Sequence, residues 1–199
     1  MKIPDIIFAL ITGRVVGFLV QDFLWELNIT TNVTENIIVW IIFPLLALLG
    51  LWLCQIIGRR LTFVHQAGKH LLIGAFATIF DLKLFEWLIW VAGIVFLVNP
   101  LVAKGVSFIA ATFIKYWGNK YWAFERHENA NMRQELTQFF LITIIGLIID
   151  VAVFYGAIKF LGPFIPFSPI LWTKLAVIMA ALVAAIWNFL GYKFFVFKK

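Results

Sequence analysis

The chain has 199 residues, a net charge of +6, 63% hydrophobic residues and 13% charged residues. Soluble domains carry about 25% charged residues, so this composition excludes an ordinary soluble protein and indicates a protein that is embedded in a membrane. The apolar runs leave little sequence for a soluble domain. We therefore expect the cations to contact anionic lipid headgroups, and we expect no nucleic-acid partner.

We predict an all-α fold, a polytopic bundle of six transmembrane helices. A helix needs about 20 apolar residues to cross a membrane, and six runs come close to that length: Ile6–Leu24, Ile37–Ile57, Leu71–Phe96, Leu101–Trp117, Leu136–Leu161 and Ile170–Phe189. We divide the chain into an N-terminal pair of helices (residues 1–64), a first hairpin (65–128) and a second hairpin (129–199).

The N-terminal pair begins with a segment that carries Arg14 near its middle. With this charge, and with no small-residue cleavage site after it, the segment does not resemble a cleavable signal peptide, and we expect it to be retained. An arginine inside a membrane needs a partner of opposite charge, so we expect Arg14 to pair with Asp81 or Asp150. The single cysteine, Cys54, excludes a disulfide within one chain, and we expect it only to pack.

The two hairpins are predicted to be copies of one unit. Residues 115–124 (KYWGNKYWAF, the first ending) match residues 188–197 (NFLGYKFFVF, the second ending). The preceding helices also match, with His70 over Phe139 and Asp81 over Asp150. Such a repeat constrains the architecture. Since each copy crosses the membrane twice, both copies share one orientation, and we predict a tandem parallel repeat rather than an inverted one.

The lysines and arginines indicate the orientation. Most of them lie at one side of the predicted bundle, near the start of the chain or at the ends of the second, fourth and sixth predicted spans: Lys2, Arg59, Arg60, Lys69, Lys115, Lys120, Arg126, Arg133, Lys193, Lys198 and Lys199. Because cytoplasmic loops are enriched in lysine and arginine, we predict a multi-pass protein of the cytoplasmic membrane with both termini in the cytoplasm.

Two acids, Asp81 and Asp150, occupy matching positions inside predicted spans. Asp150 has apolar residues on both sides, and a charge at the centre of a membrane helix costs at least about 2.5 to 3.5 kcal/mol. Asp81 occupies the matching position. Two interpretations stay open: such acids lock helices together, or they line a polar pathway for a charged ligand. Asn188, and Lys115 at the matching position, would extend that pathway toward the cytoplasm.

Lysines occur at both ends of the hairpins. Lys120 and Lys193 belong to the two endings, whose rings suit the headgroup region; these rings form a predicted aromatic gate of Trp117, Trp122, Trp187 and Phe195. At the opposite side, turns at Val98–Pro100 and Gly162–Pro169 precede Lys104 and Lys174. All four lysines can serve as simple interfacial anchors or can bind an anionic headgroup.

The second hairpin resembles the GtrA-like family of small membrane proteins. The resemblance rests on Asp150, on the prolines of the outer loop and on WNFLGYKFFVF, residues 187–197. The last helix of that family ends in Asn-Phe-Leu-x-x-Arg/Lys-x-Trp/Phe-x-Phe. The likeness covers about residues 69–199. Two features depart from the family pattern, since Lys115 replaces asparagine in the first copy and residues 1–64 add a pair of helices.

The resemblance implies that the protein moves a polyprenyl phosphate, or a sugar linked to one, across the cytoplasmic membrane for assembly of surface polysaccharide or glycolipid. The residues that we expect to bind the phosphate are Lys120, Lys193, Arg14, Lys104 and Lys174. Those that we expect to line the polar pathway are Asp81, Asp150, Asn188 and Lys115.

We expect no enzyme activity, metal or cofactor. The three histidines lack the spacing of metal ligands, and the chain has no glycine-rich phosphate loop. We expect a separate glycosyltransferase to charge the lipid, and a homodimer is compatible with so few helices. Two other functions stay open, a proton-coupled exporter of the multidrug type that uses Asp150, and a structural membrane partner of a glycosyltransferase. The lysines and Arg14 would repel a cationic substrate.

Overall fold

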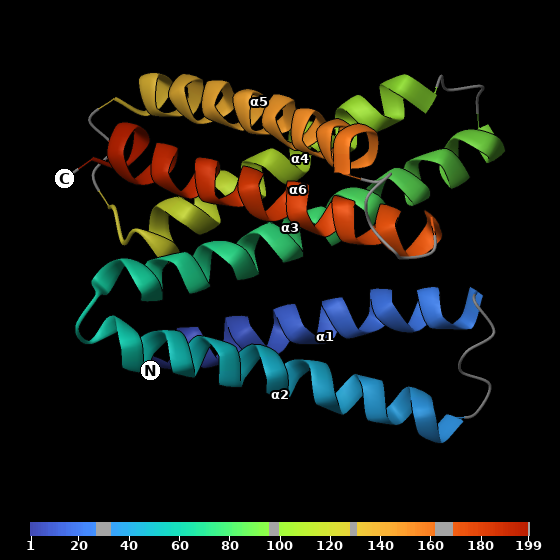
Figure 1. Cartoon of the computed structure of the whole chain (residues 1–199), viewed down its shortest axis with the longest axis horizontal. Helices are drawn as coiled ribbons and strands as arrows, with labels where there is room; N and C mark the ends of the chain where they lie inside the picture. Colours follow the sequence, from blue (N-terminus) through green and yellow to red (C-terminus); the bar gives the residue numbers. More distant parts are fainter. Residues whose placement is uncertain (27–32, 96–99, 128–130, 162–168, 199) are drawn as a thin grey trace. The chain divides into compact units, whose positions relative to one another are not determined.

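The computed structural model is all-α, as the sequence predicts. It describes residues 1–26, 33–95, 100–127, 131–161 and 169–198. Within these ranges the helices are α1 (Ile3–Glu26), α2 (Val33–Gly58), α3 (Thr62–Val95), α4 (Pro100–Trp117), α5 (Met132–Gly156) and α6 (Pro169–Gly191) (Figure 1). Three π-helical segments accompany them: η1 (Gly118–Ala123), η2 (Ala157–Leu161) and η4 (Tyr192–Val196). The predicted turns Val98–Pro100 and Gly162–Pro169 fall almost entirely outside the described residues.

Three described segments are long and apolar enough to cross a membrane: Ile37–Gly58, Met132–Leu161 and Met179–Val196. Their surfaces leave large apolar side chains uncovered, for example Leu46, Ile148 and Leu182. A helix that exposes such residues to water would be costly, whereas lipid tails solvate them. The chain is therefore a membrane protein, and its six-span topology stays a prediction.

The chain divides into two compact units, Met1–Glu125 and Arg126–Lys199. The N-terminal pair thus belongs to the same unit as the first hairpin, where α3 contacts α1, α2 and α4. The backbones of α1 and α2 approach closely, because a Cβ on Gly13 would lie 2.5 Å from Cα of Pro44. Small residues permit such contact between membrane helices. Cys54 packs against Gly68 of α3.

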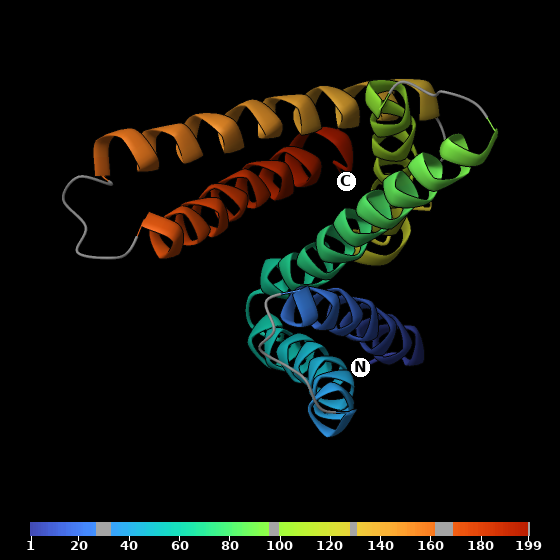
Figure 2. The ribbon, with the colours of Figure 1, turned by 90° about the vertical axis from the view of Figure 1, so that its right-hand side faces the viewer.

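Each hairpin pairs a helix with a partner that buries a small residue on successive turns. In α4 these residues are Ala103, Ser107 and Ala111, and in α6 they are Ala176, Ala180 and Ala184. Figure 2 shows α5 and α6 lying side by side in the second unit, and the two helices are in contact. A stripe of small side chains lets two helices pack with little space between them.

Both endings pass from an α-helix into a π-helix at a glycine. Gly118 packs against Ile73, because a Cβ there would lie 3.0 Å from the isoleucine side chain. Gly191 packs in the same way against Ile142, at 2.6 Å. A π-helical turn holds an extra residue and redirects the side chains that follow, and such turns are frequent at functional sites. The two endings are therefore the natural place to look for a site.

Candidate functional site

In the first ending, η1 turns polar side chains into the protein. Asn119 and Lys120 are 0% and 1% exposed. The Nζ atom of Lys120 lies 3.3 Å from Oη of Tyr116 and 5.8 Å from the ring centre of Tyr121. The sequence predicts that Lys120 reaches the lipid headgroups, but in this conformation the lysine lies inside the first unit. Lys193, at the matching position of the second ending, also lies in a π-helix but is partly exposed, so the π-helical turn alone does not determine whether this lysine is buried.

A hydrogen-bonded pair lies beside Lys120. The ring nitrogen Nδ1 of His70, on α3, is 2.7 Å from Oδ1 of Asn119. The Asn119 amide in turn donates to the backbone carbonyl of Lys115, also at 2.7 Å. Both side chains are buried, so each meets its hydrogen-bonding needs at the contact between α3 and the first ending.

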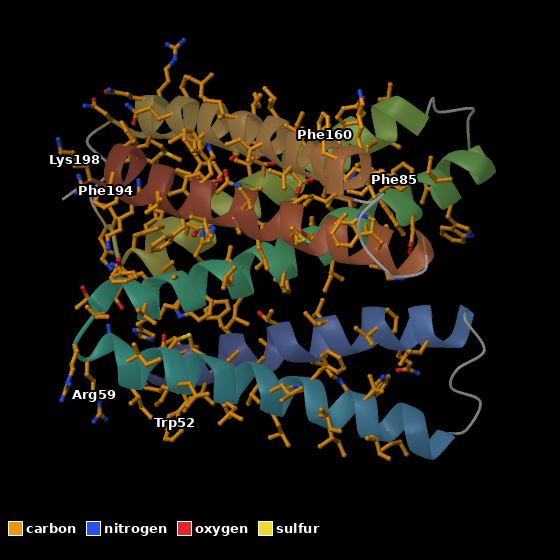
Figure 3. All side chains as sticks on the ribbon, in the orientation of Figure 1. Trp52, Arg59, Phe85, Phe160, Phe194 and Lys198 are labelled. Carbon is orange, nitrogen blue, oxygen red and sulfur yellow. The ribbon has the colours of Figure 1, made fainter. Side chains whose placement is uncertain are left out.

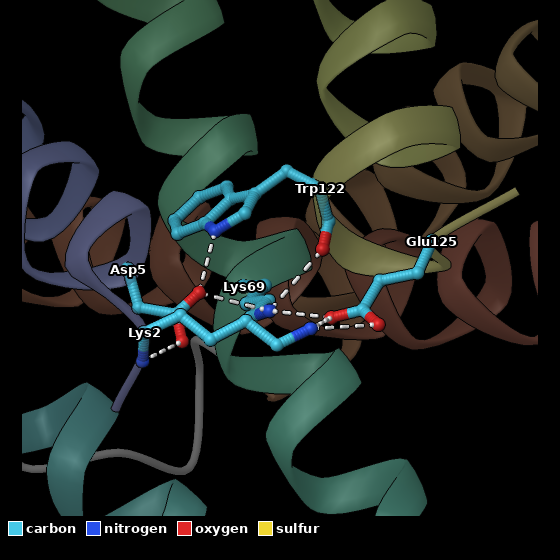
Figure 4. A network of polar contacts seen from close by, with 5 residues as sticks. All are labelled: Lys2, Asp5, Lys69, Trp122 and Glu125. Carbon is cyan, nitrogen blue, oxygen red and sulfur yellow. Dashed lines mark hydrogen bonds and ion pairs between the residues drawn. The ribbon is translucent and has the colours of Figure 1, made fainter. Parts of the chain in front are cut away.

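The first ending is joined to the N-terminus of α1 by a polar network (Figure 4). The Lys69 ammonium lies 2.9 Å from a carboxylate oxygen of Asp5, and the two side chains are 3% and 2% exposed. The indole of Trp122 donates to the same oxygen at 2.8 Å. Lys69 also donates to the backbone carbonyl of Trp122 at 3.3 Å and contacts Glu125 at 3.4 Å, while Lys2 binds Glu125 at 3.0 Å.

This network determines the charge of its acids. Burial by itself would raise the pKa of Asp5, but hydrogen bonds from Lys69, Trp122 and the Lys2 backbone hold it below its ordinary value. The hydrogen bond from Lys2 is the main cause that lowers the pKa of Glu125. Both carboxylates are therefore ionised at neutral pH and neutralise the two lysines. The network is built to hold α1 against the first ending, and it leaves no net charge for an anionic ligand.

A second polar cluster lies nearer the other end of the first hairpin. Ser107, which is 0% exposed, donates a hydrogen bond of 2.6 Å to Asp81, and Lys104 forms an ion pair with the same carboxylate. Lys104 is 52% exposed on its side chain. The structure thus brings together Asp81 and Lys104, which the sequence assigned to different roles.

Arg14 has other partners. Its guanidinium donates to the backbone carbonyl of Trp40 at 3.1 Å and lies 3.6 Å from the centre of the Trp40 ring. The predicted pair of Arg14 with Asp81 is wrong, because Asp81 binds Lys104 and Ser107 instead. Stacking on an indole and a carbonyl bond satisfy a guanidinium without a carboxylate.

The second ending holds Asn188 at the contact between α5 and α6. Asn188 is 7% exposed, and its Oδ1 atom is buried and accepts no hydrogen bond from the described residues. Gly146 of α5 provides the space, since a Cβ there would lie 2.4 Å from that oxygen. A buried acceptor without a donor costs about 1–3 kcal/mol. Such a cost is common at sites that serve a ligand.

Thr143 of α5 and Tyr192 of η4 form a hydroxyl pair in the same unit as Asn188. The hydroxyls of Thr143 and Tyr192 are 2.6 Å apart, and the Tyr192 ring stacks on Phe139 with 4.1 Å between ring centres. Thr143 also donates to the carbonyl of Phe139. Residues 139–143 of α5 and residue 192 of η4 therefore form a fixed polar and aromatic contact inside the second unit.

The other predicted residues of the second unit are less enclosed. Lys193 is partly exposed, with its ammonium 5.8 Å from the ring centre of Phe189 and 5.7 Å from that of Phe194. Asp150 is partly exposed on α5, and among the described side chains none binds it. The side chain of Lys174 lies outside the described residues.

The four rings of the predicted aromatic gate have different surroundings within their own units. Trp117 and Phe195 are 50% and 71% exposed, as expected for rings in a headgroup region. Trp122 instead binds Asp5, and the Trp187 indole donates to the carbonyl of Ile142 at 3.2 Å. Two of the four rings therefore have structural partners in their own units.

Sequence reasoning missed Asp5, His70, Asn119, Thr143 and Tyr192 as polar contacts. One signal could have found His70, Asn119 and Tyr192, but not Thr143, which matches Gly74 in the first hairpin. The alignment of the hairpins places His70 over Phe139 and Asn119 over Tyr192, so the residues that meet in one hairpin also meet in the other. No such signal exists for Asp5, because it precedes the repeated region.

Comparison with known proteins identifies a family. Residues 69–197 match the sequence model of a family described as GtrA/DPMS, transmembrane domain. No curated protein and no solved structure matches the chain. The matched range begins at Lys69 and ends at Phe197, so it contains both hairpins and excludes the N-terminal pair.

Proposed function

Because the chain belongs to the GtrA/DPMS transmembrane-domain family, we propose that it moves a polyprenyl phosphate, or a sugar carried on one, across the membrane. Membership makes it a membrane protein of glycolipid and polysaccharide biosynthesis. The flipping activity and the identity of the carrier lipid are our proposal.

The observation that carries the proposal is the setting of Lys193. This lysine lies within Met179–Val196, a segment apolar enough to cross a membrane, and it is partly exposed between the rings of Phe189 and Phe194. A cation is costly in such a segment unless it reaches the interface or meets an anion. A partly exposed ammonium at this position can contact the phosphate at the end of a lipid chain, and aromatic faces suit an attached sugar.

Polar groups of the second unit support a route beyond Lys193. Asn188 offers a buried acceptor, and Asp150 offers a carboxylate farther along α5. We propose that these two groups accept hydrogen bonds in turn from the hydroxyls of a carried sugar while the hydrocarbon tail stays in the lipid. Lys104 and Lys174 would serve at the opposite face, and Lys120 and Arg14 would take part only after movements that uncover the first and release the second from Trp40.

The proposal includes topology. We propose six membrane crossings, a tandem repeat of hairpins and both termini in the cytoplasm, which places the two endings at the cytoplasmic face. The matched glycine contacts of Gly118 and Gly191 support the repeat. The protein would act without catalysis, and a separate glycosyltransferase would supply the charged lipid.

Reconstitution in liposomes tests the activity. A fluorescent polyprenyl phosphate in the outer leaflet should be exchanged across the bilayer faster with purified protein than in protein-free vesicles. Lys193→Ala should abolish that gain, because it removes the cation that receives the phosphate. Lys198→Ala is the matched control, since Lys198 is exposed and follows the spanning segment, and it should keep wild-type transport.

Two results would count against this function. If Lys193→Ala transports normally, the lysine is only an interfacial anchor. If no carrier lipid moves but a cationic dye is exchanged for protons, the protein is an exporter, and the lysines of the endings have no substrate role.

A further inference from the structure

We propose that the N-terminal pair binds one anionic phospholipid in a groove beside α2, with the phosphate at Arg59 and one hydrocarbon chain along the helix. The groove has a volume of about 460 Å³, within the range of about 300–1,000 Å³ typical of ligand sites. Its apolar lining comes mainly from Ile6, Leu45, Leu48, Leu49, Trp52 and Ile56. Its polar lining comes from Gln55 and Arg59.

The lining residues of α2 form one continuous stripe. Leu45, Trp52 and Arg59 are spaced seven residues apart, so they lie on the same face of the helix. Figure 3 shows the side chains of Trp52 and Arg59 projecting from the same side of α2. The apolar surface is thus continuous, and the cation lies at one end of it. An amphipathic ligand with a charged head and an apolar tail matches this order.

The length of the stripe favours a membrane phospholipid. Leu45 and Ile56 are eleven residues apart, which is about 16 Å along an α-helix. One leaflet of the hydrocarbon core is about 15 Å deep, half of about 30 Å. The groove therefore holds a chain that ends near the middle of the bilayer. A polyprenyl chain is several times longer and would extend far beyond it.

The charge at the end of the stripe favours an anion. Arg59 follows the last residue of α2, and its backbone N–H donates to the carbonyls of Gln55 and Ile56, which fixes the backbone. Among the described residues, none supplies a hydrogen bond or a carboxylate to its guanidinium. Asp5, the nearest acid in sequence to Ile6, is already bound by Lys69 and Trp122. Arginine binds phosphate oxygens in pairs.

This site lies outside residues 69–197, the part of the chain that matches the family. It therefore requires only that the protein is embedded in a membrane, and it does not rest on the proposed transport. Its consequence is a role for the N-terminal pair, which would tie the protein to anionic lipid on the Arg59 side of the membrane.

Native mass spectrometry of the full chain in detergent tests the site. The wild-type protein should retain one phosphatidylglycerol with higher affinity than phosphatidylcholine of the same chains. Arg59→Gln should weaken retention by at least about tenfold, the loss expected for a charge-assisted contact. Arg60→Gln, which removes the neighbouring exposed cation outside the groove, should leave retention unchanged.

A second pair of variants tests the apolar part. Leu49→Trp should fill the groove and exclude the lipid, whereas Leu53→Trp should not, because Leu49 lines the groove and Leu53 does not. The two leucines are matched at 49% and 47% exposed. Equal loss in Arg59→Gln and Arg60→Gln, equal retention of the two phospholipids, or retention of a polyprenyl phosphate alone would each overturn the proposal.

Discussion

At matching positions the two hairpins use different chemistry for the same contact. His70 binds Asn119 in the first hairpin, whereas Phe139 stacks on Tyr192 in the second. The backbone around these pairs is alike, since each ending is held by a glycine that packs against an isoleucine of the preceding helix. The comparison teaches that the packing of small residues is shared between the hairpins, while the polar groups differ.

Asp81 and Asn119 of the first hairpin have hydrogen-bond partners, whereas the buried oxygen of Asn188 in the second has none among the described residues. At the start of the first hairpin, Nε2 of His65 and Oε1 of Gln66 are also buried without a hydrogen bond from the described residues. Asp81 binds Ser107 and Lys104, but the position that matches Ser107 is Ala180. Asn119 is satisfied by His70, but the buried oxygen of Asn188 is not satisfied by any described group. We infer that the first hairpin is adapted for attachment to the N-terminal pair and the second for a ligand.

The largest predicted effect comes from breaking the buried ion pair of Asp5 and Lys69, which attaches α1 to the first hairpin. Asp5→Ala should lower the free energy of unfolding by about 3–5 kcal/mol, because Lys69 would remain charged and buried without its main partner. Thermal unfolding in detergent, followed by circular dichroism, measures the loss. Gln138 occupies the position in the second hairpin that matches Lys69, and Gln138→Ala should have a much smaller effect.

Two further variants decide whether the ion pair is the cause. Lys2→Ala removes only an exposed pair with Glu125, and exposed pairs add little stability. The double variant Asp5→Ala with Lys69→Met should recover much of the stability, because no buried charge remains. A double variant as unstable as Asp5→Ala would show that shape, rather than charge, matters at this position.

The next prediction compares Asn119 with Asn188, where the same substitution should change stability in opposite directions. Asn119→Leu should lower the free energy of unfolding by about 1–3 kcal/mol, because it leaves His70 buried without its partner. Asn188→Leu should leave stability unchanged or raise it by about 1 kcal/mol, because it removes an unmet acceptor. Transport should fall in Asn188→Leu alone. Equal destabilisation by both variants would mean that Asn188 has a structural role like that of Asn119.

A smaller effect on stability is expected at Gly146, which leaves space for the Asn188 amide. Gly146→Ala should cost about 1–3 kcal/mol by overpacking, since the new Cβ would meet the Asn188 amide. Adding Asn188→Ala should recover the stability that Gly146→Ala loses. Gly74, a helical glycine of the first hairpin, serves as the control, because a Cβ there meets no atom within 4 Å, and Gly74→Ala should be neutral or mildly stabilising.

Much of this contrast could be predicted from the sequence, because composition and repetition are strong signals. The apolar runs predict an all-α membrane protein, and the matched endings bring residues 119 and 192 to equivalent places. Gly118 and Gly191 also occur at the same position of both endings. Such patterns depend on neighbouring residues or on helical periodicity, so they can be recognised in the sequence before the contacts between helices are known.

The partners of charged residues could not be predicted in the same way. Asp5 and Lys69 are 64 residues apart in the sequence, and no periodicity links α1 to α3. Lys120 turns inward beside Tyr116, whereas Lys193 at the matching position is partly exposed, although both lie in π-helices. Arg14 binds a carbonyl and a ring instead of an acid, a choice that depends on how closely α1 and α2 approach.

The smallest predicted effect is that acid weakens the first unit before the second. Burial, reinforced by the charge of Lys69, lowers the pKa of His65 below 6.5. The stability that neutral His65 provides is therefore complete above about pH 6.5 and falls as the pH drops toward its lower folded pKa. The pKa values of Asp5 and Glu125 are also lowered, from 3.8 and 4.5, so their contributions are lost only below about pH 4.5.

Thermal unfolding between pH 8 and pH 3 should show two successive declines in stability, and His65→Gln should remove the first one only. Gln134 occupies the matching position of the second hairpin, where no such titration is available. A first decline that persists in His65→Gln would assign it to a different group and would remove this difference between the hairpins.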